Sequence, residues 1–305
     1  MNNTVVSAEL VKELRHRTNA PMMDCKKALV EANGDIDLAI ENMRKAGQAR
    51  GVKKAGRITA EGSLGVLTDA SNKKAVIIEI NCETDFVARE AQFQQFVKEV
   101  ASLSLDKEVS ELESLSSLPT KANPAQTVEE YRLELIGKLG ENISMRRMHL
   151  QKTQGVIATY GHGDANGIRI ATVVALKNGT PELAKDLAMH VAAMNPEYIV
   201  ESEVPQSRID KEKEIYLTQT REKEVGKPEA MIEKIVENKL KKFVSEISLL
   251  GQAFVKEPSV KIENLLKSHK AEVEFFLRYE VGEGIEKKED NFVAEVMNQA
   301  RGAVS

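Results

Sequence analysis

The stretch that decides the fold runs from residue 75 to residue 101 and reads AVIIEINCETDFVAREAQFQQFVKEVA. Its first six residues form a short apolar run, rich in β-branched side chains, which is typical of a buried strand. Further along, Phe93, Phe96 and Val97 recur at helical spacing and would share one face of a helix. The sequence therefore predicts a buried strand that leads into an amphipathic helix.

The same order of elements occurs twice along the chain. Residues 62–103 predict two strands joined by a turn and followed by a helix. About ninety residues later, a strand at 155–160, a turn at 161–167, a strand at 168–176 and a helix at 181–194 repeat this order, although the identity between the two copies is low. Strands followed by helices in each copy predict an α+β fold, with antiparallel sheets that helices cover on one face.

Three short helices are predicted before this core. Ser7 can cap the first helix, and Asn33-Gly34 is a natural left-handed stop for the second. Asp35 can then cap a third helix. The residues from 47 to 57 are rich in glycine and cations and contain no acid, so we interpret them as a basic linker.

A different kind of segment lies between residues 201 and 243. It is dense in Glu and Lys, and its main turn signal is Gly226-Lys227-Pro228. We expect two charged helices that form an antiparallel hairpin projecting from the body. Beyond the hairpin, alternating apolar residues at 273–279 predict a strand, and a last helix is expected to begin near Asp290.

Composition excludes several classes of protein. The 305 residues would fill about two domains. Lys and Arg number 43 against 47 Asp and Glu, and this net charge of −4 disfavours a general binder of polyanions. No run approaches the roughly 18 apolar residues of a membrane span, and the first residues lack the features of a signal peptide. Two cysteines, Cys25 and Cys82, make no disulfide framework, so we expect a cytosolic protein with reduced thiols.

Motifs of enzyme active sites are absent from the sequence. It contains no GxSxG, GxxxxGK[ST], CxxC or HExxH pattern, and its five histidines are scattered. We therefore predict neither an enzyme, nor a cofactor, nor a metal site. His162, in a glycine-rich turn, is the histidine most expected to be exposed.

Met22 and Met23 are candidates for a binding surface. Cys25 and Leu29 help to define the apolar face of the second helix; Met22 borders this face, and Met23 falls nearly opposite to it. An exposed methionine suits a partner-binding surface, because its flexible thioether adapts to irregular apolar pockets. The alternative fits the sequence equally well: the exposed methionine is a single apolar residue on the surface without a binding role.

The segment from Glu83 to Arg89 joins the buried strand to the following helix. Thr84 or Asp85 can cap that helix, which gives both a structural role. Phe86 falls on the same helical stripe as Phe93, so periodicity alone predicts that Phe86 belongs to the core.

At these residues the chain resembles the elongation factor Ts family, the bacterial guanine-nucleotide exchange factors for elongation factor Tu. The matches are long, jointly ordered and spread over nearly the whole chain. They are Leu10-Val11-Lys12-Glu13-Leu14-Arg15, Met22-Met23-Asp24-Cys25-Lys26-Lys27-Ala28-Leu29, Asn33-Gly34-Asp35, Ala39-Ile40-Glu41-Asn42-Met43-Arg44-Lys45, Thr84-Asp85-Phe86-Val87-Ala88, Gly140-Glu141-Asn142-Ile143, Ala188-Met189-His190-Val191-Ala192-Ala193 and Val281-Gly282-Glu283-Gly284.

The resemblance implies a domain organisation. It comprises a ubiquitin-associated-like helical module, a linker, two related α+β subdomains, a coiled-coil hairpin inserted in the second subdomain, and a C-terminal helical module. The boundaries we assign are 1–46 for the first module, 47–57 for the linker, 58–152 for core subdomain N, 153–200 with 244–282 for core subdomain C, 201–243 for the hairpin and 283–305 for the last module.

The resemblance also implies site residues. Thr84, Asp85, Phe86 and Val87 would act as a wedge near the magnesium and phosphate site of elongation factor Tu, GDP-bound or nucleotide-free, which contradicts the core prediction for Phe86. Met22 and Met23 would contact the partner's G domain, and His162 would face its third domain. Whether two copies associate in the complex stays open.

Two other functions compete with nucleotide exchange. The chain could be a ubiquitin-associated-type adaptor or a translation-linked scaffold that leaves nucleotide affinity unchanged. It could instead bind nucleic acid through the cations between Lys45 and Arg57. No aromatic residues lie among these cations and the whole chain is acidic, so direct nucleic-acid binding is not expected.

Overall fold

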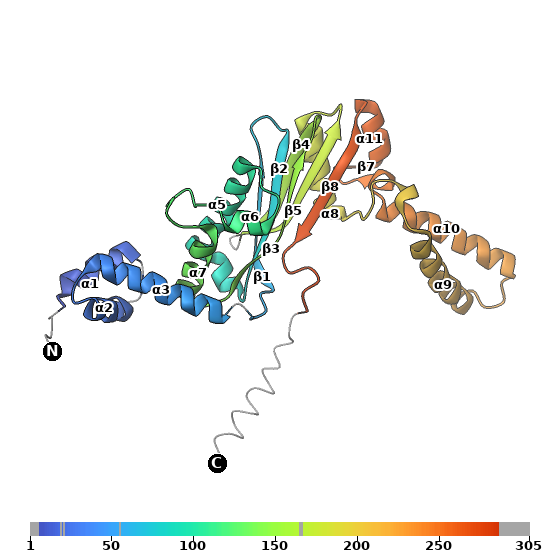
Figure 1. The fold of residues 1–305 in the computed structure, drawn as a ribbon. Helices are drawn as coiled ribbons and strands as arrows, with labels where there is room; N and C mark the ends of the chain where they lie inside the picture. Colours follow the sequence, from blue (N-terminus) through green and yellow to red (C-terminus); the bar gives the residue numbers. More distant parts are fainter. Residues whose placement is uncertain (1–5, 19, 21, 55, 165–166, 287–305) are drawn as a thin grey trace, which may run out of the picture.

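Two three-stranded antiparallel sheets lie at the centre of the computed structural model, which describes residues 6–18, 20, 22–54, 56–164 and 167–286 (Figure 1). The first sheet has the order β1-β2-β3 and the second the order β4-β5-β8. Their strands are β1 (Glu61–Thr68), β2 (Lys74–Cys82), β3 (Ile143–Lys152), β4 (Val156–Asp164), β5 (Gly167–Lys177) and β8 (Glu272–Glu280), and a small hairpin pairs β6 (Ala253–Phe254) with β7 (Glu257–Lys261).

Helices surround the sheets and extend beyond them (Figure 1). They are α1 (Ala8–Thr18), α2 (Met22–Glu31), α3 (Ile36–Lys54), α4 (Asp85–Arg89), α5 (Ala91–Lys107), α6 (Leu112–Ser116), α7 (Val128–Leu139), α8 (Pro181–Met194), α9 (Gln206–Lys223), α10 (Glu229–Ile247) and α11 (Ile262–His269). In the described part of the chain, none of these helices is both long and apolar enough to cross a bilayer.

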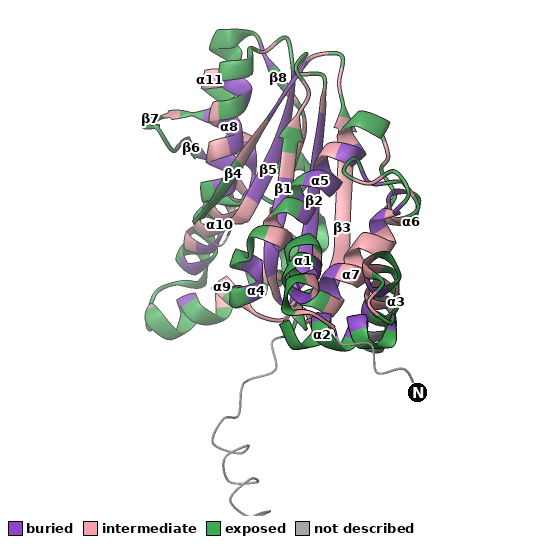
Figure 2. Ribbon diagram, turned by 90° about the vertical axis from the view of Figure 1, so that its left-hand side faces the viewer, coloured by how far each residue is buried: buried purple, intermediate pink, exposed green. Residues whose placement is uncertain are grey.

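The two sheets pack face to face, and each is covered on its other side by helices. Leu64 and Ile77 of the first sheet form an apolar cluster with Ile157 and Val173 of the second. The outer face of the first sheet packs against α5, and that of the second packs against α8. Because β2 is buried on both faces, it is a continuous apolar run rather than an alternating one (Figure 2). The predicted α+β class and the repeated order of strands and helix are confirmed.

Glu79 interrupts this apolar run on β2, and its buried carboxylate joins three parts of the chain. It accepts hydrogen bonds from Arg147 Nε on β3 (2.5 Å), from Asn81 Nδ2 (2.9 Å) and from the Gly282 amide beyond β8 (2.8 Å). Burial alone raises the pKa of Glu79, but the hydrogen bonds from Gly282, Asn81 and Arg147 outweigh it and hold the pKa below its ordinary value. Gly282 has φ +76°, and a Cβ there would lie 2.3 Å from the Ala60 carbonyl oxygen.

The N-terminal module has the predicted caps. Ser7 Oγ accepts a hydrogen bond from the Leu10 amide (3.2 Å), and Asp35 Oδ1 accepts one from the Leu38 amide (3.0 Å). Asn33 and Gly34 have positive φ, as a left-handed helix stop requires. Cys25 is fully buried in the module's core with Leu29, which confirms it as a core thiol.

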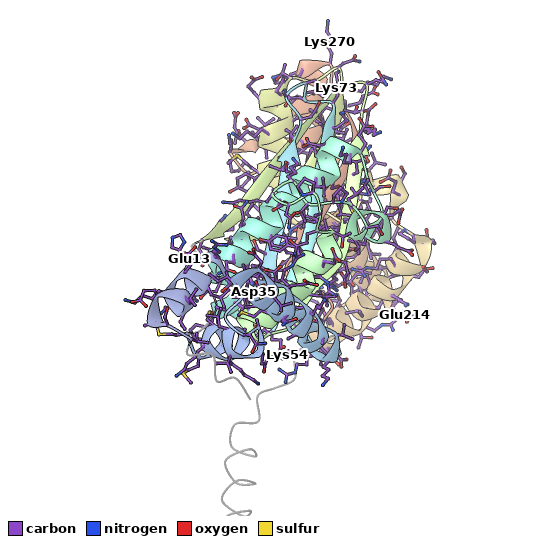
Figure 3. The ribbon with its side chains drawn as sticks, turned by 60° about the vertical axis from the view of Figure 1, so that its left-hand side comes forward. Glu13, Asp35, Lys54, Lys73, Glu214 and Lys270 are labelled. Carbon is purple, nitrogen blue, oxygen red and sulfur yellow. The ribbon has the colours of Figure 1, made fainter. Side chains whose placement is uncertain are left out.

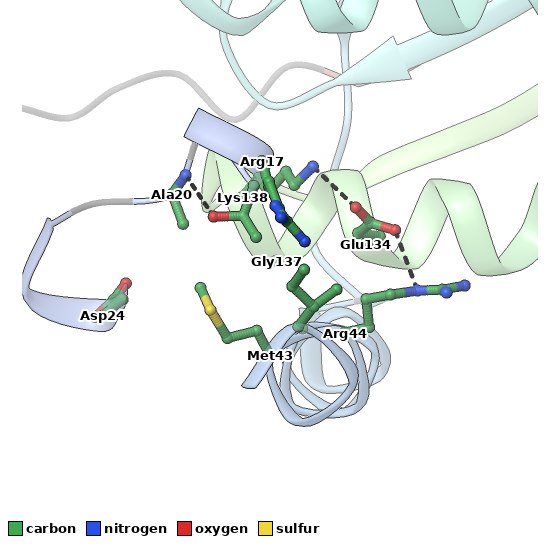
Figure 4. Close-up of a pocket in the computed structure, with 11 residues that line it drawn as sticks. Arg17, Ala20, Asp24, Met43, Arg44, Glu134, Gly137 and Lys138 are labelled. Carbon is green, nitrogen blue, oxygen red and sulfur yellow. Dashed lines mark hydrogen bonds and ion pairs between the residues drawn. The ribbon is translucent and has the colours of Figure 1, made fainter. Parts of the chain in front are cut away.

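The segment interpreted as a linker continues α3 as far as Lys54, so two of its glycines, Gly47 and Gly51, are part of a helix. Gly47 lies against Gly137 of α7, where a Cβ on Gly137 would come within 2.7 Å of Gly47 Cα. Beside this contact, Glu134 of α7 pairs with Arg44 of α3 at 3.8 Å and with Lys138 at 2.8 Å, in the wall of a small pocket of about 120 Å³ (Figure 4). The close approach of two glycines lets α3 pack directly on the core.

The hairpin formed by α9 and α10 projects from the sheets on the side opposite the N-terminal module (Figure 1). Its turn lies at Gly226-Lys227-Pro228, as predicted, and Tyr216 of α9 contacts Phe243 of α10 edge to face. Figure 3 shows Glu214 on the hairpin, well away from Asp35 and Lys54 at the two ends of α3. The predicted last helix near Asp290, and most of the expected C-terminal module 283–305, lie outside the described residues.

Strand β3 was not predicted from the sequence. It pairs with β2 along its whole length. Its residues, ISMRRMHLQK, are mostly half-buried, with Met145 and Met148 packed on the core of α5 and with Arg147 and His149 lying over Tyr279 and Phe275 of β8. Because so few of its side chains are β-branched, the strand lacks the usual local signal.

We predict that Gly137→Ala destabilises the docking of α3, whereas Gly47→Ala does not. The new Cβ at position 137 would press on the backbone of Gly47, but a Cβ at position 47 would lie 4.0 Å from Gly137 Cα. We expect Gly137→Ala to lower the free energy of unfolding by about 2 kcal/mol, and Gly47→Ala to raise it by up to ~1 kcal/mol through helix propensity. Denaturant unfolding and amide hydrogen exchange of α3 measure both effects. Equal stabilisation by the two variants would contradict the close packing.

We also predict that Glu79→Ala lowers the free energy of unfolding by about 3 kcal/mol at pH 7, because it leaves buried donors without their carboxylate. The pKa of Glu79 is depressed in the folded state, so its contribution is complete above the ordinary value of 4.5 and is lost as the pH falls through the folded-state pKa. Thermal unfolding from pH 7 down to pH 3 should therefore show the difference from the parent shrinking.

Glu108→Ala is the matched control for Glu79→Ala. Glu108 also bridges β2 and β3, through Lys74 and Lys152, and hydrogen bonds from these lysines lower its pKa to about 2. Glu108 is exposed, so water replaces its partners at little cost. If Glu108→Ala lowered the free energy of unfolding as much as Glu79→Ala, burial of the carboxylate would not explain the effect.

Candidate functional site

The candidate site begins where β2 ends. Thr84 is the N-cap of the five-residue helix α4, and its Oγ1 accepts a hydrogen bond from the Val87 amide (3.4 Å). Cys82 Sγ donates to the Thr84 carbonyl oxygen at 3.1 Å. Burial raises the pKa of the Cys82 thiol, so this cysteine is a structural group rather than a nucleophile. The predicted cap at Thr84 is confirmed.

Glu141, in the loop after α7, holds the start of α4 from the other side. The Thr84 amide donates to Glu141 Oε2 (2.9 Å), and Thr84 Oγ1 donates to Glu141 Oε1 (2.7 Å). Beside it, the Asn142 amide donates to Glu83 Oε1 (2.6 Å), and Asn142 Nδ2 donates to the Arg57 carbonyl oxygen (2.9 Å). Sequence reasoning matched these residues to the family but gave them no role.

Phe86 projects from α4 into solvent, with 74% of its surface exposed. The next residue, Val87, is only 7% exposed and packs with Ala88 into the core of the first sheet. Arg89 lies over the Phe86 ring at 5.8 Å and forms an ion pair with Asp85. In the tip formed by Thr84, Asp85, Phe86 and Val87, the Phe86 side chain is exposed, the Asp85 side chain is partly exposed, and Val87 anchors the tip in the core.

The core prediction for Phe86 from periodicity is wrong. The helical stripe through Phe93 does not reach Phe86, because Glu90 has extended backbone (φ −61°, ψ 132°) and separates α4 from α5. This break turns the two helices relative to each other. The sequence around Glu90 contains neither Gly nor Pro, so no local signal marks the break.

Met22 and Met23 lie at the start of α2 and are exposed. Met23 is 73% exposed and Met22, which borders the apolar face, is 46% exposed, whereas Cys25 and Leu29 on the apolar face are fully buried. The predicted facing of the two methionines is therefore correct.

His162 lies in a strand rather than in a turn, because β4 continues to Asp164. Its exposed ring stacks on Tyr160, with the ring centres 6.5 Å apart. The end of this hairpin lies close to α4: Gln94 Nε2 donates to the Ala88 carbonyl oxygen (2.7 Å), and the same side chain lies against Gly167. Gln94 also lines a groove of about 550 Å³ between α5 and the β4–β5 hairpin.

Three of the five cations proposed for nucleic-acid binding have partners within the protein. Lys45 pairs with Glu41 at 2.6 Å, Lys54 donates to the Gly140 carbonyl oxygen, and Arg57 pairs with Glu83 at 3.3 Å. Such contacts reduce the positive charge that this segment offers to phosphate.

The described residues include histidine and acidic side chains, which often bind metal ions or transfer protons. No three or more His, Cys, Asp and Glu side chains gather there in a way that could hold a metal ion. His190 is buried, with one ring nitrogen at 2.9 Å from Gln252 Oε1 and the other accepting from the Val255 amide, and burial lowers its pKa. Among the described residues, the exposed large apolar side chains include Phe86, Met23 and, in the hairpin turn, Val225.

Comparisons with known proteins agree on one family. The family model described as elongation factor TS matches residues 83–283. Three similar curated proteins, all called elongation factor Ts, come from Legionella pneumophila strain Lens (49% identity over 98% of this chain and 99% of the relative), Thioalkalivibrio sulfidiphilus (47%, 98% and 99%) and Coxiella burnetii strain Dugway (45%, 98% and 99%). The chain therefore belongs to the elongation factor Ts family.

Proposed function

We propose that this translation elongation factor promotes release of GDP from elongation factor Tu, so that GTP can take its place, and that the tip formed by Thr84, Asp85, Phe86 and Val87 acts near the partner's magnesium and phosphate site. The observation that carries the proposal is Phe86, an aromatic side chain left 74% exposed on a helix whose next two residues are buried. Exposed aromatic residues on a rigid support are typical anchors of protein interfaces.

Magnesium coordination makes a small wedge effective. Mg²⁺ neutralises the nucleotide phosphates and demands near-ideal octahedral geometry, so a small displacement of its surroundings weakens nucleotide binding. Asp85 adds a carboxylate beside the Phe86 ring, and Arg89 pairs with it. The tip therefore combines an apolar wedge with a charged flank.

Thermodynamic linkage allows the factor to cycle. A protein that weakens GDP binding is itself bound more weakly, by the same factor, when GDP is present. Exchange then passes through a nucleotide-free complex, and no covalent bond changes.

Further contacts with the partner would come from Met22 and Met23 on α2 and from His162 on β4. The hydrogen bond from Gln94 to Ala88, and its contact with Gly167, support a shared partner for α4 and the end of the β4–β5 hairpin, because they bring the two together. Met22 and Met23 offer adaptable apolar contacts beside the docked α3.

Release of labelled GDP from elongation factor Tu tests the proposal. We expect the parent chain to accelerate release, and Phe86→Ala to slow it at least about tenfold, as the loss of an interface anchor does. Since Phe86 is exposed, the unfolding temperature should change little. Val225→Ala, at an exposed apolar residue in the hairpin turn, is the control and should leave the rate unchanged.

Two outcomes would contradict this prediction. If the parent chain binds elongation factor Tu without accelerating GDP release, the protein is an adaptor rather than an exchange factor. If Phe86→Ala melts the protein while exchange per folded molecule stays normal, Phe86 is a structural residue.

Met23→Ala should weaken complex formation with elongation factor Tu by about tenfold, the effect of losing a substantial apolar contact. Because Met23 is exposed, the free energy of unfolding should stay within about 0.5 kcal/mol of the parent. Titration calorimetry against nucleotide-free elongation factor Tu, with Met231→Ala on α10 as the control, measures the loss. Equal affinities of Met23→Ala and the control would remove Met23 from the interface.

A further inference from the structure

We propose that Glu141 is a positioning residue for the exchange reaction: its carboxylate fixes the start of α4 and so sets the direction in which Asp85 and Phe86 point. This inference rests on the exchange function proposed above. Glu141 lies in the loop between α7 and β3, 57 positions from Thr84 along the chain, and it reaches Thr84 with both carboxylate oxygens.

Helix α4 cannot fix its own direction. It has five residues, fewer than an isolated helix needs to be stable. Val87 and Ala88 bury their side chains, but Phe86 is exposed and Asp85 is partly exposed, so neither packs in the core. Gln94 Nε2 also holds the far end of α4 through the Ala88 carbonyl oxygen, and Cys82 Sγ contacts the Thr84 carbonyl oxygen. Without Glu141, these contacts and two small buried side chains would leave the first turn of α4 free to fray or to rotate.

Glu141 supplies hydrogen bonds that fix the start of α4. Its two oxygens accept from the amide and from the hydroxyl of one residue, Thr84, and hydrogen bonds to an ionised carboxylate are stronger than neutral ones. Thr84 Oγ1 donates to Glu141 and at the same time accepts from the Val87 amide. The hydroxyl therefore transmits the position of Glu141 to the first turn of α4.

The loop that carries Glu141 is itself held on both sides. Gly140 has φ +80° and ends α7, and its carbonyl oxygen accepts from Lys54 at the end of α3. On the other side of Glu141, the Asn142 amide donates a hydrogen bond to Glu83, and Asn142 Nδ2 donates one to the Arg57 carbonyl oxygen. These contacts keep Glu141 at a fixed place relative to both β2 and α3.

A second explanation for Glu141 is its charge. A half-exposed carboxylate beside the tip could act directly on the partner's magnesium or phosphate site. Glu141→Gln separates the two explanations. A glutamine is uncharged, but its Oε1 can accept from the Thr84 amide while its Nε2 donates to Thr84 Oγ1, so the positioning contacts remain.

The experiment compares the full-length chain with Glu141→Ala, Glu141→Gln and the control Glu111→Ala, an exposed glutamate in the same subdomain. GDP release from elongation factor Tu is measured over a range of exchange-factor concentrations. We expect Glu141→Ala to lower the maximal rate about tenfold or more, the size expected for losing hydrogen bonds to a charged group. The concentration that gives half the maximal rate should change less than about threefold, because Met23 is untouched.

A second measurement does not depend on the partner. In the free protein, amide hydrogen exchange of residues 84–88 should be about tenfold faster or more in Glu141→Ala, and close to the parent in Glu141→Gln and Glu111→Ala. The rates of GDP release should follow the same order: Glu141→Ala should be slow, and Glu141→Gln should have most of the parent's activity.

Three results would overturn the inference while leaving the proposed function intact. In each, the parent chain accelerates GDP release and Phe86→Ala does not. The inference fails if Glu141→Ala has the parent's rate, if it is slow only in proportion to unfolded protein, or if Glu141→Gln is as slow as Glu141→Ala, which would show that the charge acts on the partner. If the parent chain itself fails to accelerate release, the proposed function fails instead, and the hydrogen-exchange result still tests the contact with Thr84.

Discussion

The buried carboxylate of Glu79 is the constraint on which the arrangement of the two sheets depends. A carboxylate between packed sheets is strongly unfavourable unless hydrogen bonds and positive charge compensate it. Here the compensation comes from Arg146 and Arg147 on β3 and from the Gly282 amide beyond β8, so the carboxylate favours the arrangement in which these groups lie beside β2. Because β2 runs directly into Thr84, this arrangement also gives α4 a fixed starting point.

Local sequence signals were sufficient for the elements that have a strong local pattern. The β-branched run before Glu83 predicts β2, and Asn33-Gly34 and Asp35 mark the end of α2 and the start of α3. Strand β3 escaped prediction because its stability comes from pairing with β2 and from Arg147 and His149 packing on β8, which no local pattern reveals. The same holds for α3. Its glycines favour a linker in the sequence, and their place in a packed helix depends on the contact of Gly47 with Gly137 of α7.

The residues of the candidate site also divide into those that the local sequence predicts and those that it does not. Thr84 as an N-cap can be recognised from its own neighbourhood, and the facing of Met23 follows from the helical period. The exposure of Phe86 could not be predicted from periodicity, because the break between α4 and α5 at Glu90 is marked by neither Gly nor Pro. Glu141 could not be found either, since its partner is far away in the sequence; only the resemblance singled out the segment in which it lies.

The helical course of α3 changes what the N-terminal module can do. A module on a flexible linker would raise only the local concentration of its binding surface, and its binding could not fix the direction of a wedge elsewhere. A module docked through Gly47 on α7 is different, because α7 continues into the loop that holds α4 through Glu141. The proposed contact at Met23 and the proposed insertion of Phe86 would then take place on one connected frame. Packed elements of this kind can carry energetic coupling between two sites, and α7 is the element that connects them here.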